Sequence, residues 1–303
     1  MVSGAFTGLR SVAVNGTSLA YREEGQGEPV VFIHGSASDL RSWEQQIPAV
    51  AVRYRAIAYS RRYARPNEDI PDGVDDQMLP HVADLADFLR ALDIPAAHLV
   101  GHSWGGFIAL LAAIGHPELV RTLVLIEPPI LPLFISTPPR VGELFGLLLR
   151  RPRIALGIVK FAATALLPAQ SAYRRGDDER AMWTFGRGVL GKTGFARLTE
   201  SRKQRVRDNC RADRAQLMGA GFPALSDSDV RRVRCPALLL TGEKSPAIWR
   251  LLSSRLAELL PGAQFTEIPG GSHLLHEEAA ALVNAIILAF LAERDLQRPG
   301  AHH

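Results

Sequence analysis

The sequence predicts an α/β fold: a mostly parallel central sheet with helices on both faces, interrupted by one inserted helical cap. Two observations predict it. Short apolar runs typical of buried strands alternate with segments of helical spacing, which is the pattern of a parallel sheet covered by helices. Between Pro128 and Arg234 the strand rhythm disappears and only helical apolar stretches remain. We therefore expect a core domain of residues 1–127 and 235–303 and a cap of residues 128–234.

The first elements of the expected core can be justified in order. Asn15-Gly16 separates two segments with alternating apolar residues, and this dipeptide suits the two-residue type I′ turn of a β-hairpin. The continuous apolar run at residues 29–33 then predicts a strand buried on both faces. Arg55–Tyr59 predicts another strand, and the apolar spacing of His81–Leu92 predicts a helix after it.

The alternation continues to the end of the chain. A strand ending at Val100 precedes an apolar helix that Gly115 and Pro117 close. The next strand lies in the segment RTLVLIEPP. After the expected cap, the pattern predicts two strands, at residues 236–243 and Gln264–Ile268, a helix between them at Ile248–Leu260, and a final amphipathic helix through Leu282, Ile286, Phe290 and Leu291.

Composition places the chain among globular proteins. It has 303 residues, of which 47% are hydrophobic and 22% charged, enough to bury a sizeable core. The net charge of +4 comes from arginines scattered in short groups, without interleaved aromatic residues or a basic helical stripe, so no nucleic-acid partner is expected. Nothing in the composition determines the oligomeric state.

Location is inferred from the termini, cysteines and apolar runs. Only two cysteines occur, and the N-terminal residues do not have the pattern of a secretory signal, so we expect a cytoplasmic protein. The most apolar stretches, Leu144–Leu149 and Ile154–Leu167, are flanked or interrupted by basic residues. Neither contains about eighteen uncharged residues in a row, so no transmembrane segment is expected.

The strongest chemical motif is Gly101-His102-Ser103-Trp104-Gly105, which matches G-x-S-x-G. It lies between an expected strand and an expected helix, where a serine on a tight turn needs small residues two positions before and after it. The helix N-terminus then directs free N–H groups and the positive end of its dipole at charge that develops on a substrate. We interpret Ser103 as a nucleophile.

Two further motifs occur in a matching order: His34-Gly35 after the strand at 29–33, and Gly271-Ser272-His273 before the last helix. With these three motifs the chain resembles the α/β-hydrolase superfamily, over roughly residues 9–128 and 233–292. Three separated motifs in order are far more specific than one pentapeptide. The resemblance implies a hydrolase with an elbow serine and a histidine base.

The resemblance also implies roles for individual residues. His273 stands where the family keeps its base, and a neutral imidazole can take and return the serine proton at physiological pH. The backbone N–H groups of Ser36 and Trp104 would form the oxyanion hole, in which losing one donor typically costs about 2.7–4 kcal/mol. His34 is expected to order its loop, and His276 is the competing candidate for the base.

The third member of the triad departs from the common pattern. Ser245 occupies the position at which related sequences usually carry the acid, and a serine cannot stabilise an imidazolium as a carboxylate does. Some superfamily members place the acid after the strand that follows the elbow helix, and Glu127 stands there. We expect Glu127 to be the acid and Glu243 to be the reserve, with a dyad or an acid from elsewhere as the remaining possibility.

Two other segments are given structural interpretations. Ser60-Arg61-Arg62 stands where many relatives have an aspartate-arginine-glycine turn, and we expect a solvated loop rather than a substrate-steering arginine. The apolar residues of the cap are expected to form a hydrophobic roof over the pocket; they include Leu131, Leu133, Phe134, Phe145, Leu148, Ile154, Ile158, Phe161 and Leu166.

The sequence thus favours a serine hydrolase that cleaves a carboxylic ester, lactone or related acyl substrate through an acyl-enzyme on Ser103. The expected partner is a small, apolar acyl compound. No cofactor is implied, and no metal-ligand motif occurs. Cofactor-free carbon–carbon hydrolysis and perhydrolysis of the haloperoxidase-like type use the same triad and stay open, as does a ligand receptor on the same fold.

Overall fold

The computed structural model describes residues 8–137 and 139–296. Residues 1–7, on which part of the expectation about a secretory signal rests, lie outside this range. Within it, the strands form one eight-stranded sheet in the order β1-β2-β4-β3-β5-β6-β7-β8. Strands β4, β3, β5, β6, β7 and β8 run parallel, and β1 and β2 are antiparallel to their neighbours. The strand bounds are β1 Arg10–Val14, β2 Thr17–Glu24, β3 Pro29–Ile33, β4 Arg55–Tyr59, β5 Ala97–His102, β6 Val120–Ile126, β7 Ala237–Gly242 and β8 Gln264–Ile268.

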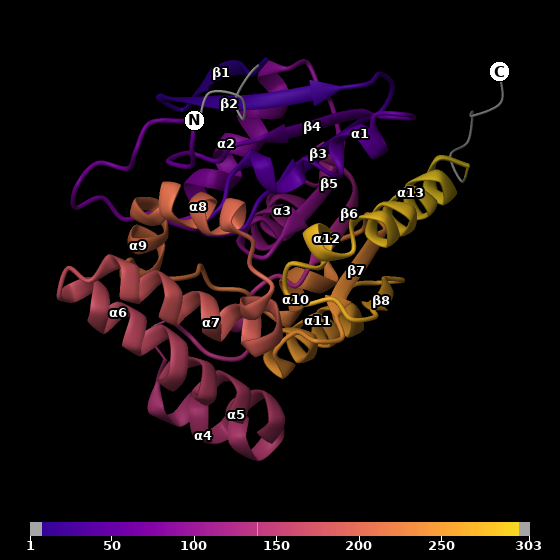
Figure 1. Cartoon of the computed structure of the whole chain (residues 1–303). Coiled ribbons are helices and arrows are strands. Elements are labelled where there is room, and N and C mark those ends of the chain that lie inside the picture. The colour runs from indigo at the N-terminus through magenta and orange to yellow at the C-terminus, as the bar shows by residue number, and fades with distance from the viewer. Residues whose placement is uncertain (1–7, 138, 297–303) are drawn as a thin grey trace.

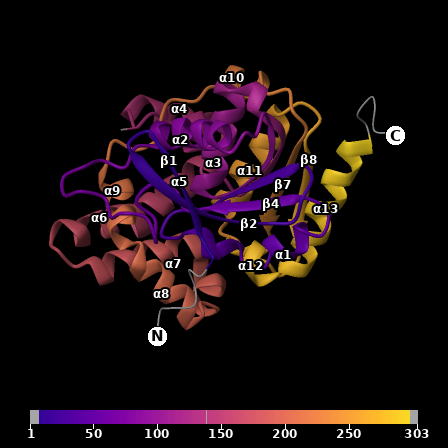
Figure 2. The same cartoon turned by 90° about the horizontal axis from the view of Figure 1, so that it is seen from above.

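Helices cover both faces of the sheet (Figures 1 and 2). One hydrophobic cluster joins the sheet to α2, α3 and α11, and a second joins the opposite face to α1 and α13. The fold class predicted from the sequence is confirmed. The bounds of the helices outside the insertion are η1 Leu40–Trp43, α1 Ile47–Val50, α2 Met78–Ala91, α3 Trp104–Gly115, η2 Pro117–Leu119, α11 Ala247–Leu259, α12 Leu275–Glu278 and α13 Ala280–Leu296.

The N-terminal hairpin forms as predicted. Val14 pairs with Thr17, which leaves Asn15 and Gly16 as the two turn residues. Both have positive φ, 46° and 73°, as a type I′ turn requires. Asparagine and glycine are the residues that tolerate this conformation best, so the dipeptide fixes the register of the first two strands.

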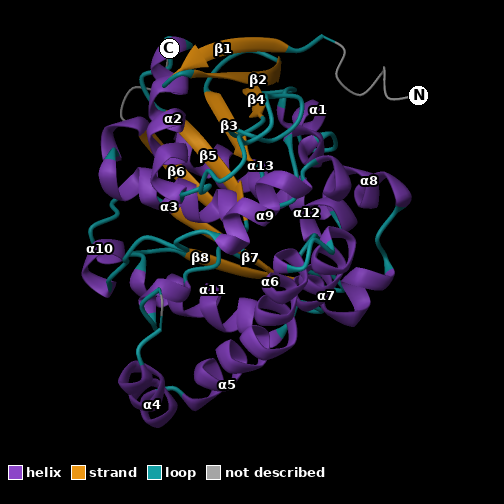
Figure 3. Cartoon of the chain, turned by 90° about the vertical axis from the view of Figure 1, so that its left-hand side faces the viewer, coloured by secondary structure: helices purple, strands orange, loops and turns teal. Residues whose placement is uncertain are grey.

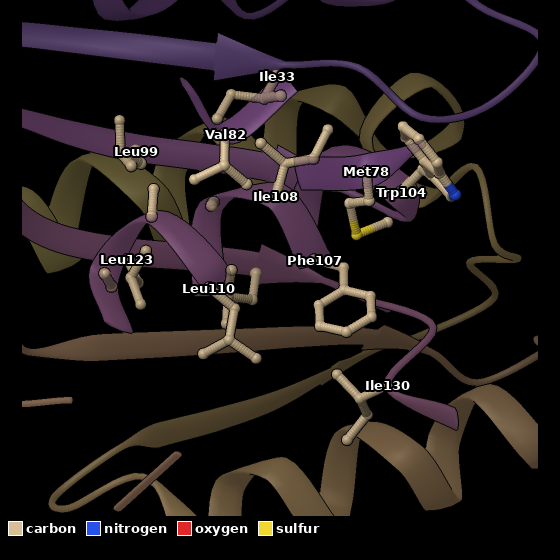
Figure 4. Close-up of a cluster of buried hydrophobic side chains, with 14 of the residues drawn as sticks. Ile33, Met78, Val82, Leu99, Trp104, Phe107, Ile108, Leu110, Leu123 and Ile130 are labelled. Atoms are coloured by element: carbon tan, nitrogen blue, oxygen red, sulfur yellow. The ribbon is translucent and has the colours of Figure 1, made fainter. Parts of the chain in front are cut away.

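Helix α3 is held on the sheet by a dense apolar cluster (Figure 4). Its residues Phe107, Ile108 and Leu110 are fully buried, against Leu99 of β5 and Leu123 of β6 in the same cluster. Burying one such side chain contributes about 1.5–3 kcal/mol. The residue before α3 is Ser103, so this packing fixes the position of the serine relative to the strand ends.

The segment between β6 and β7, residues 128–234, is here named the helical insertion. In the described part it contains helices and loops but no strand of the sheet. Figure 3 shows α4 and α5 at the edge of the molecule farthest from β1. Its helices are η3 Leu131–Leu133, α4 Val141–Arg150, α5 Pro152–Phe161, the π-helical turn η4 Ala162–Leu166, α6 Leu167–Arg174, α7 Asp178–Ala196, α8 Glu200–Asp208, α9 Cys210–Met218 and α10 Asp227–Arg231.

Helices α5 and α6 join through η4 into one continuous helix, Pro152–Arg174. Among the described residues it is the one helix long and apolar enough, by length and composition, to cross a membrane, although no such segment was expected. One third of its most apolar window is buried. Ala165, Ala169, Ala172 and Tyr173 are fully buried against other parts of the protein. One helix of this kind is weak evidence for a membrane span, because helices of folded proteins can be equally long and apolar.

Candidate active site

Ser103 lies on the tight turn between β5 and α3. Its φ of 50° and ψ of −120° place the backbone in a region that few residues other than glycine adopt. The Ser103 N–H donates to the carbonyl of Ile126 at the end of β6, at 2.8 Å, and the Ser103 carbonyl accepts from Phe107 in α3. Hydrogen bonds to both neighbouring elements hold the strained turn.

The glycines on either side of Ser103 are required by close packing of backbone. A Cβ at Gly101 would lie 2.5 Å from the carbonyl oxygen of Gly105. A Cβ at Gly105 would overlap the carbonyl groups of Ile33 and His34. The small residues that the motif demands are therefore explained by contacts between the elbow and the end of β3.

Glu127 and His273 form a buried hydrogen-bonded pair beside this turn. Glu127 follows β6, is fully buried and has a φ of 45°. Its Oε2 lies 2.6 Å from His273 Nδ1, and its Oε1 accepts from Thr241 Oγ1 at 2.6 Å and from the Gly242 N–H at 2.9 Å. Burial alone raises the pKa of Glu127, but the hydrogen bonds from His273, Thr241 and Gly242 outweigh it and lower the pKa below its usual value. A carboxylate is thus fixed against the imidazole.

The other ring nitrogen of the imidazole remains available. His273 Nε2 is buried and has no hydrogen-bond partner among the described residues, and no bond joins it to Ser103 Oγ. His273 and Ser103 nevertheless line the same cavity. In ligand-free enzymes a catalytic hydrogen bond of this kind is often long and tightens only when substrate binds.

The alternative candidates for the acid and the base, Glu243 and His276, lie away from Ser103. Glu243 is partly exposed, pairs with Lys244 at 2.6 Å and accepts from the N–H of Gly270 at 2.8 Å. Ser245 is buried and its Oγ has no partner. His276 stacks between Trp43 and His102, at ring distances of 4.7 and 4.3 Å. Burial lowers its pKa to about 3, so it stays neutral inside the protein. The structure brings neither Glu243 nor His276 to the serine.

The loop after β3 carries Ser36 and His34. Ser36 and Trp104 line the cavity together with Ser103, and Trp104 is the first residue of α3, where a helix has N–H groups without intrahelical acceptors. His34 Nε2 accepts from the Arg61 N–H at 2.9 Å, and burial followed by the charge of Arg61 lowers the pKa of His34 well below its usual value. His34 therefore orders the loop as a neutral ring.

Arg61 corrects the interpretation of residues 60–62 as a solvated loop. The side chain is 2% exposed, donates to the carbonyls of His34 and Gly35 at 3.1 and 3.0 Å, and covers the ring of Trp104 at 4.7 Å. Arg62 pairs with Asp84 on α2. The expectation was wrong because carbonyl oxygens and an aromatic face replace water around the guanidinium, and local sequence does not reveal such partners.

The cavity that contains Ser103 has a volume of about 270 Å³. The core supplies one side of its wall, through residues such as Trp104 and Leu274, and the helical insertion supplies the other. Its wall from the insertion is mainly apolar and includes Leu131, Ile135, Phe161, Leu166, Phe185, Val189, Leu190, Leu217 and Phe222. A concave apolar site with a few polar groups suits a small organic ligand.

Three polar residues of this wall were missed by sequence reasoning. Gln216 on α9 accepts from Ser36 Oγ at 2.6 Å and donates to Asp76, which also bonds His81, so it links the insertion to the loop of the core. Arg202 on α8 donates to Ser38 at 2.9 Å, and Asp213 on α9 lies in the wall itself. No motif surrounds these residues, so the sequence contains no signal that could have identified them.

Comparisons with known proteins identify the family of the chain. Residues 30–286 match the model of the Alpha/beta hydrolase family. The chain is 40% identical over 278 residues to the candidate non-heme bromoperoxidase BpoC of Mycobacterium tuberculosis, covering 91% of this chain and 98% of that protein.

Two solved structures share the fold. A thermophilic esterase from Thermogutta terrifontis has a TM-score of 0.74 at 20% identity, covering 94% of this chain and 97% of the esterase. A meta-cleavage product hydrolase from Pseudomonas fluorescens has a TM-score of 0.68 at 22% identity, with the same coverage of each chain. Among the described residues, no group of three or more histidine, cysteine, aspartate or glutamate side chains could hold a metal ion. The chain belongs to the alpha/beta hydrolase family and is an enzyme that acts on a small molecule.

Proposed function

We propose that the enzyme hydrolyses a carboxylic ester or lactone through an acyl-enzyme on Ser103. The observation that carries the proposal is the 2.6 Å contact between Glu127 Oε2 and His273 Nδ1, which leaves Nε2 as the proton acceptor in a cavity shared with Ser103. A buried carboxylate fixes the tautomer of the imidazole and stabilises the imidazolium that forms during the reaction.

The reaction proceeds in two halves. Ser103 Oγ attacks the acyl carbon while its proton passes to His273 Nε2, and the N–H groups of Ser36 and Trp104 donate to the oxyanion. His273 then returns the proton to the leaving alcohol as the acyl–oxygen bond breaks. In the second half a water molecule loses a proton to His273 and attacks the acyl-enzyme. His273 then passes that proton to Ser103 Oγ as the acyl–oxygen bond breaks, which releases the acid and regenerates both residues.

The helical insertion, residues 128–234, acts in this proposal as a cap on a core of residues 1–127 and 235–303. The support is that its apolar side chains form the wall of the cavity opposite Trp104 and His273. Closing such a wall over the serine excludes water from the oxyanion and selects the acyl chain.

Labelling and turnover test the proposed reaction directly. A fluorophosphonate probe should label the protein stoichiometrically, and p-nitrophenyl esters of medium-length acids should be hydrolysed. Both signals should disappear in Ser103→Ala. Stoichiometric labelling that persists in Ser103→Ala, or wild-type protein that neither labels nor hydrolyses any ester of the series, would reject the assignment.

Perhydrolysis is a second candidate, favoured by the 40% identity to the candidate bromoperoxidase BpoC. Hydrogen peroxide would attack the acyl-enzyme in place of water, release a peracid and regenerate Ser103. The peracid would then oxidise bromide. Bromination of monochlorodimedone in the presence of acetate, peroxide and bromide measures this activity, with Ser103→Ala as the control.

A further inference from the structure

Among the described residues, the mainly apolar wall of the cavity contains one acidic side chain, Asp213. It lies on α9, is 1% exposed and lines the same cavity as Ser103. Its hydrogen-bond partner Tyr173 belongs to a buried apolar cluster of the insertion that includes Ala172, Met182 and Leu217. Burying a carboxyl group among apolar residues costs free energy unless hydrogen bonds compensate for it, so its contacts need an explanation.

Only one of the two carboxyl oxygens of Asp213 accepts a hydrogen bond from the described part of the protein. Tyr173 Oη, on α6, donates to Asp213 Oδ2 at 3.0 Å. Asp213 Oδ1 is buried and has no partner among the described residues. The cation nearest in sequence, Arg214, pairs with Asp178 and covers the ring of Tyr173 at 5.8 Å instead of reaching the carboxyl. No ion pair with Asp213 occurs in the part of the chain that the structure describes.

Several polar side chains of the wall have partners within the protein. Gln216 is bonded at both ends of its amide, to Ser36 and Asp76. Gln170 donates to the carbonyl of Leu217, and the indole N–H groups of Trp183 and Trp249 donate to Glu179 and to the carbonyl of Val189. Among the described residues, Asp213 Oδ1 is the buried side-chain acceptor that the insertion contributes to this wall without a hydrogen-bond partner.

We propose that Asp213 determines specificity by bonding a hydroxyl group on the acyl chain of the substrate, at a point remote from the scissile carbonyl. The proposal rests on the ester hydrolysis proposed above and names its substrate class as hydroxyacyl esters or lactones. Tyr173 Oη holds Oδ2, so the carboxyl presents Oδ1 in one orientation. The apolar residues of the wall accommodate the methylene groups between the carbonyl and the hydroxyl.

A hydroxyl suits this position because it both donates and accepts. Burial raises the pKa of Asp213 to about 7, so near neutral pH both the carboxylate and the carboxylic acid are present. A hydroxyl donates to the first form and accepts from the second. An ammonium group would pair with the carboxylate alone, and a methyl terminus would leave Oδ1 unsatisfied in either form.

The test compares matched substrates within each variant. The probes are p-nitrophenyl esters of straight-chain acids with six to ten carbons and their ω-hydroxy counterparts. At the best chain length, we expect the wild type to prefer the hydroxy ester at least tenfold in kcat/KM. The ratio should fall to about one in Asp213→Leu. Because both esters are measured on the same sample, the ratio does not depend on the fraction of folded protein. Asp213→Ala provides the same readout if leucine does not fit.

Gln170→Leu is the matched control, since Gln170 lies in the same wall. It should change the rates for both esters by the same factor. An unchanged preference in Asp213→Leu or Asp213→Ala, or a wild type that prefers the plain ester at every chain length, overturns the proposal.

A binding experiment separates failure of this proposal from failure of ester hydrolysis. N-Methyl-6-hydroxyhexanamide and N-methylhexanamide are titrated calorimetrically into Ser103→Ala, which cannot turn over. Tighter binding of the hydroxy amide, lost when Asp213→Leu is added, supports the role of Asp213 even if no ester is hydrolysed. Equal binding of the two amides overturns it independently of the reaction.

Discussion

The two sides of the cavity are built in different ways. On the core side, Ser103 and Glu127 follow adjacent parallel strands, and hydrogen bonds to β6, α3 and β7 hold them. On the side of the insertion, helices α5 to α9 present side chains whose positions depend on packing between helices. Backbone geometry therefore fixes the groups proposed for the chemistry, whereas packing between helices positions the groups proposed to select the substrate.

The largest expected effect is a loss of activity on replacing His273, compared with replacing the nearby His276. His273→Ala should reduce kcat/KM for a p-nitrophenyl ester by about 10⁴-fold or more, because the imidazole and Ser103 act as one unit. His276→Ala removes a ring packed under Trp43, so it should mainly lower the melting temperature. Melting curves control for folding. A collapse of kcat/KM in His276→Ala, with His273→Ala nearly normal, would exchange the two roles.

The next prediction compares the effects of replacing two glutamates of the core on turnover. Glu127→Gln keeps the size of the side chain but removes the charge that stabilises the imidazolium, so turnover should fall by roughly 10²–10⁴-fold. Glu243→Gln alters an exposed pair with Lys244 and should leave turnover within about threefold of the wild type. Near-normal turnover in Glu127→Gln alongside a loss in Glu243→Gln would move the acid to the loop after β7.

A smaller effect is expected on the side of the insertion. Leu166→Trp adds volume to the cavity wall, so kcat/KM for the longest acyl esters should fall about tenfold, a cost of about 1.4 kcal/mol. Labelling of Ser103 by a small fluorophosphonate should stay stoichiometric. An equal loss for acetyl and decanoyl esters would contradict the division of roles between the two sides.

The last expected effect concerns stability rather than turnover, and it depends on pH. Burial raises the pKa of Asp213 from 3.8 to about 7; the titratable groups near it are Tyr173 on α6, Cys210 on α9, and Asp178 on α7 in its pair with Arg214. Between these values the folded protein holds a proton that the unfolded chain has lost. Asp213 therefore contributes stability below about pH 4 that is lost as pH rises towards 7, by at most about 1.4 kcal/mol per pH unit.

Urea unfolding at several pH values measures this dependence. Asp213→Asn has no titrating group at this position, so its stability relative to the wild type should increase between pH 5 and pH 7. Parallel stability curves for the two proteins over this range would show that Asp213 does not titrate as described.

Sequence patterns predicted the core well because its signals are local. Asn15-Gly16 requires positive φ in a tight turn, and Gly101 is required by a backbone contact with Gly105 in the same turn. Glu127 could be proposed as the acid because Ser245 occupies the usual position and a carboxylate ends the neighbouring strand. In each case the physical cause lies within a short stretch of chain or follows from the order of the strands.

The remaining features could not be predicted because their causes are contacts between distant segments. Arg61 is buried only because the carbonyls of His34 and Gly35 and the ring of Trp104 surround it. Asp213 reaches the cavity only because α9 packs against α6 and α7. A charged residue on a polar helix has the same local sequence whether it faces solvent or a ligand.

The backbone conformation of the core has a consequence for the thermal stability of the enzyme. Ser103 and Glu127 both have left-handed φ values, and each such residue typically costs about 1–3 kcal/mol. Glycine relieves this strain, so Ser103→Gly recovers part of that free energy while removing the proposed nucleophile. Glu127→Gly does not stabilise the protein, because it leaves the buried donors of His273, Thr241 and Gly242 without their acceptor. A search for heat-resistant variants that does not also assay turnover would therefore favour loss of Ser103, the residue proposed to react.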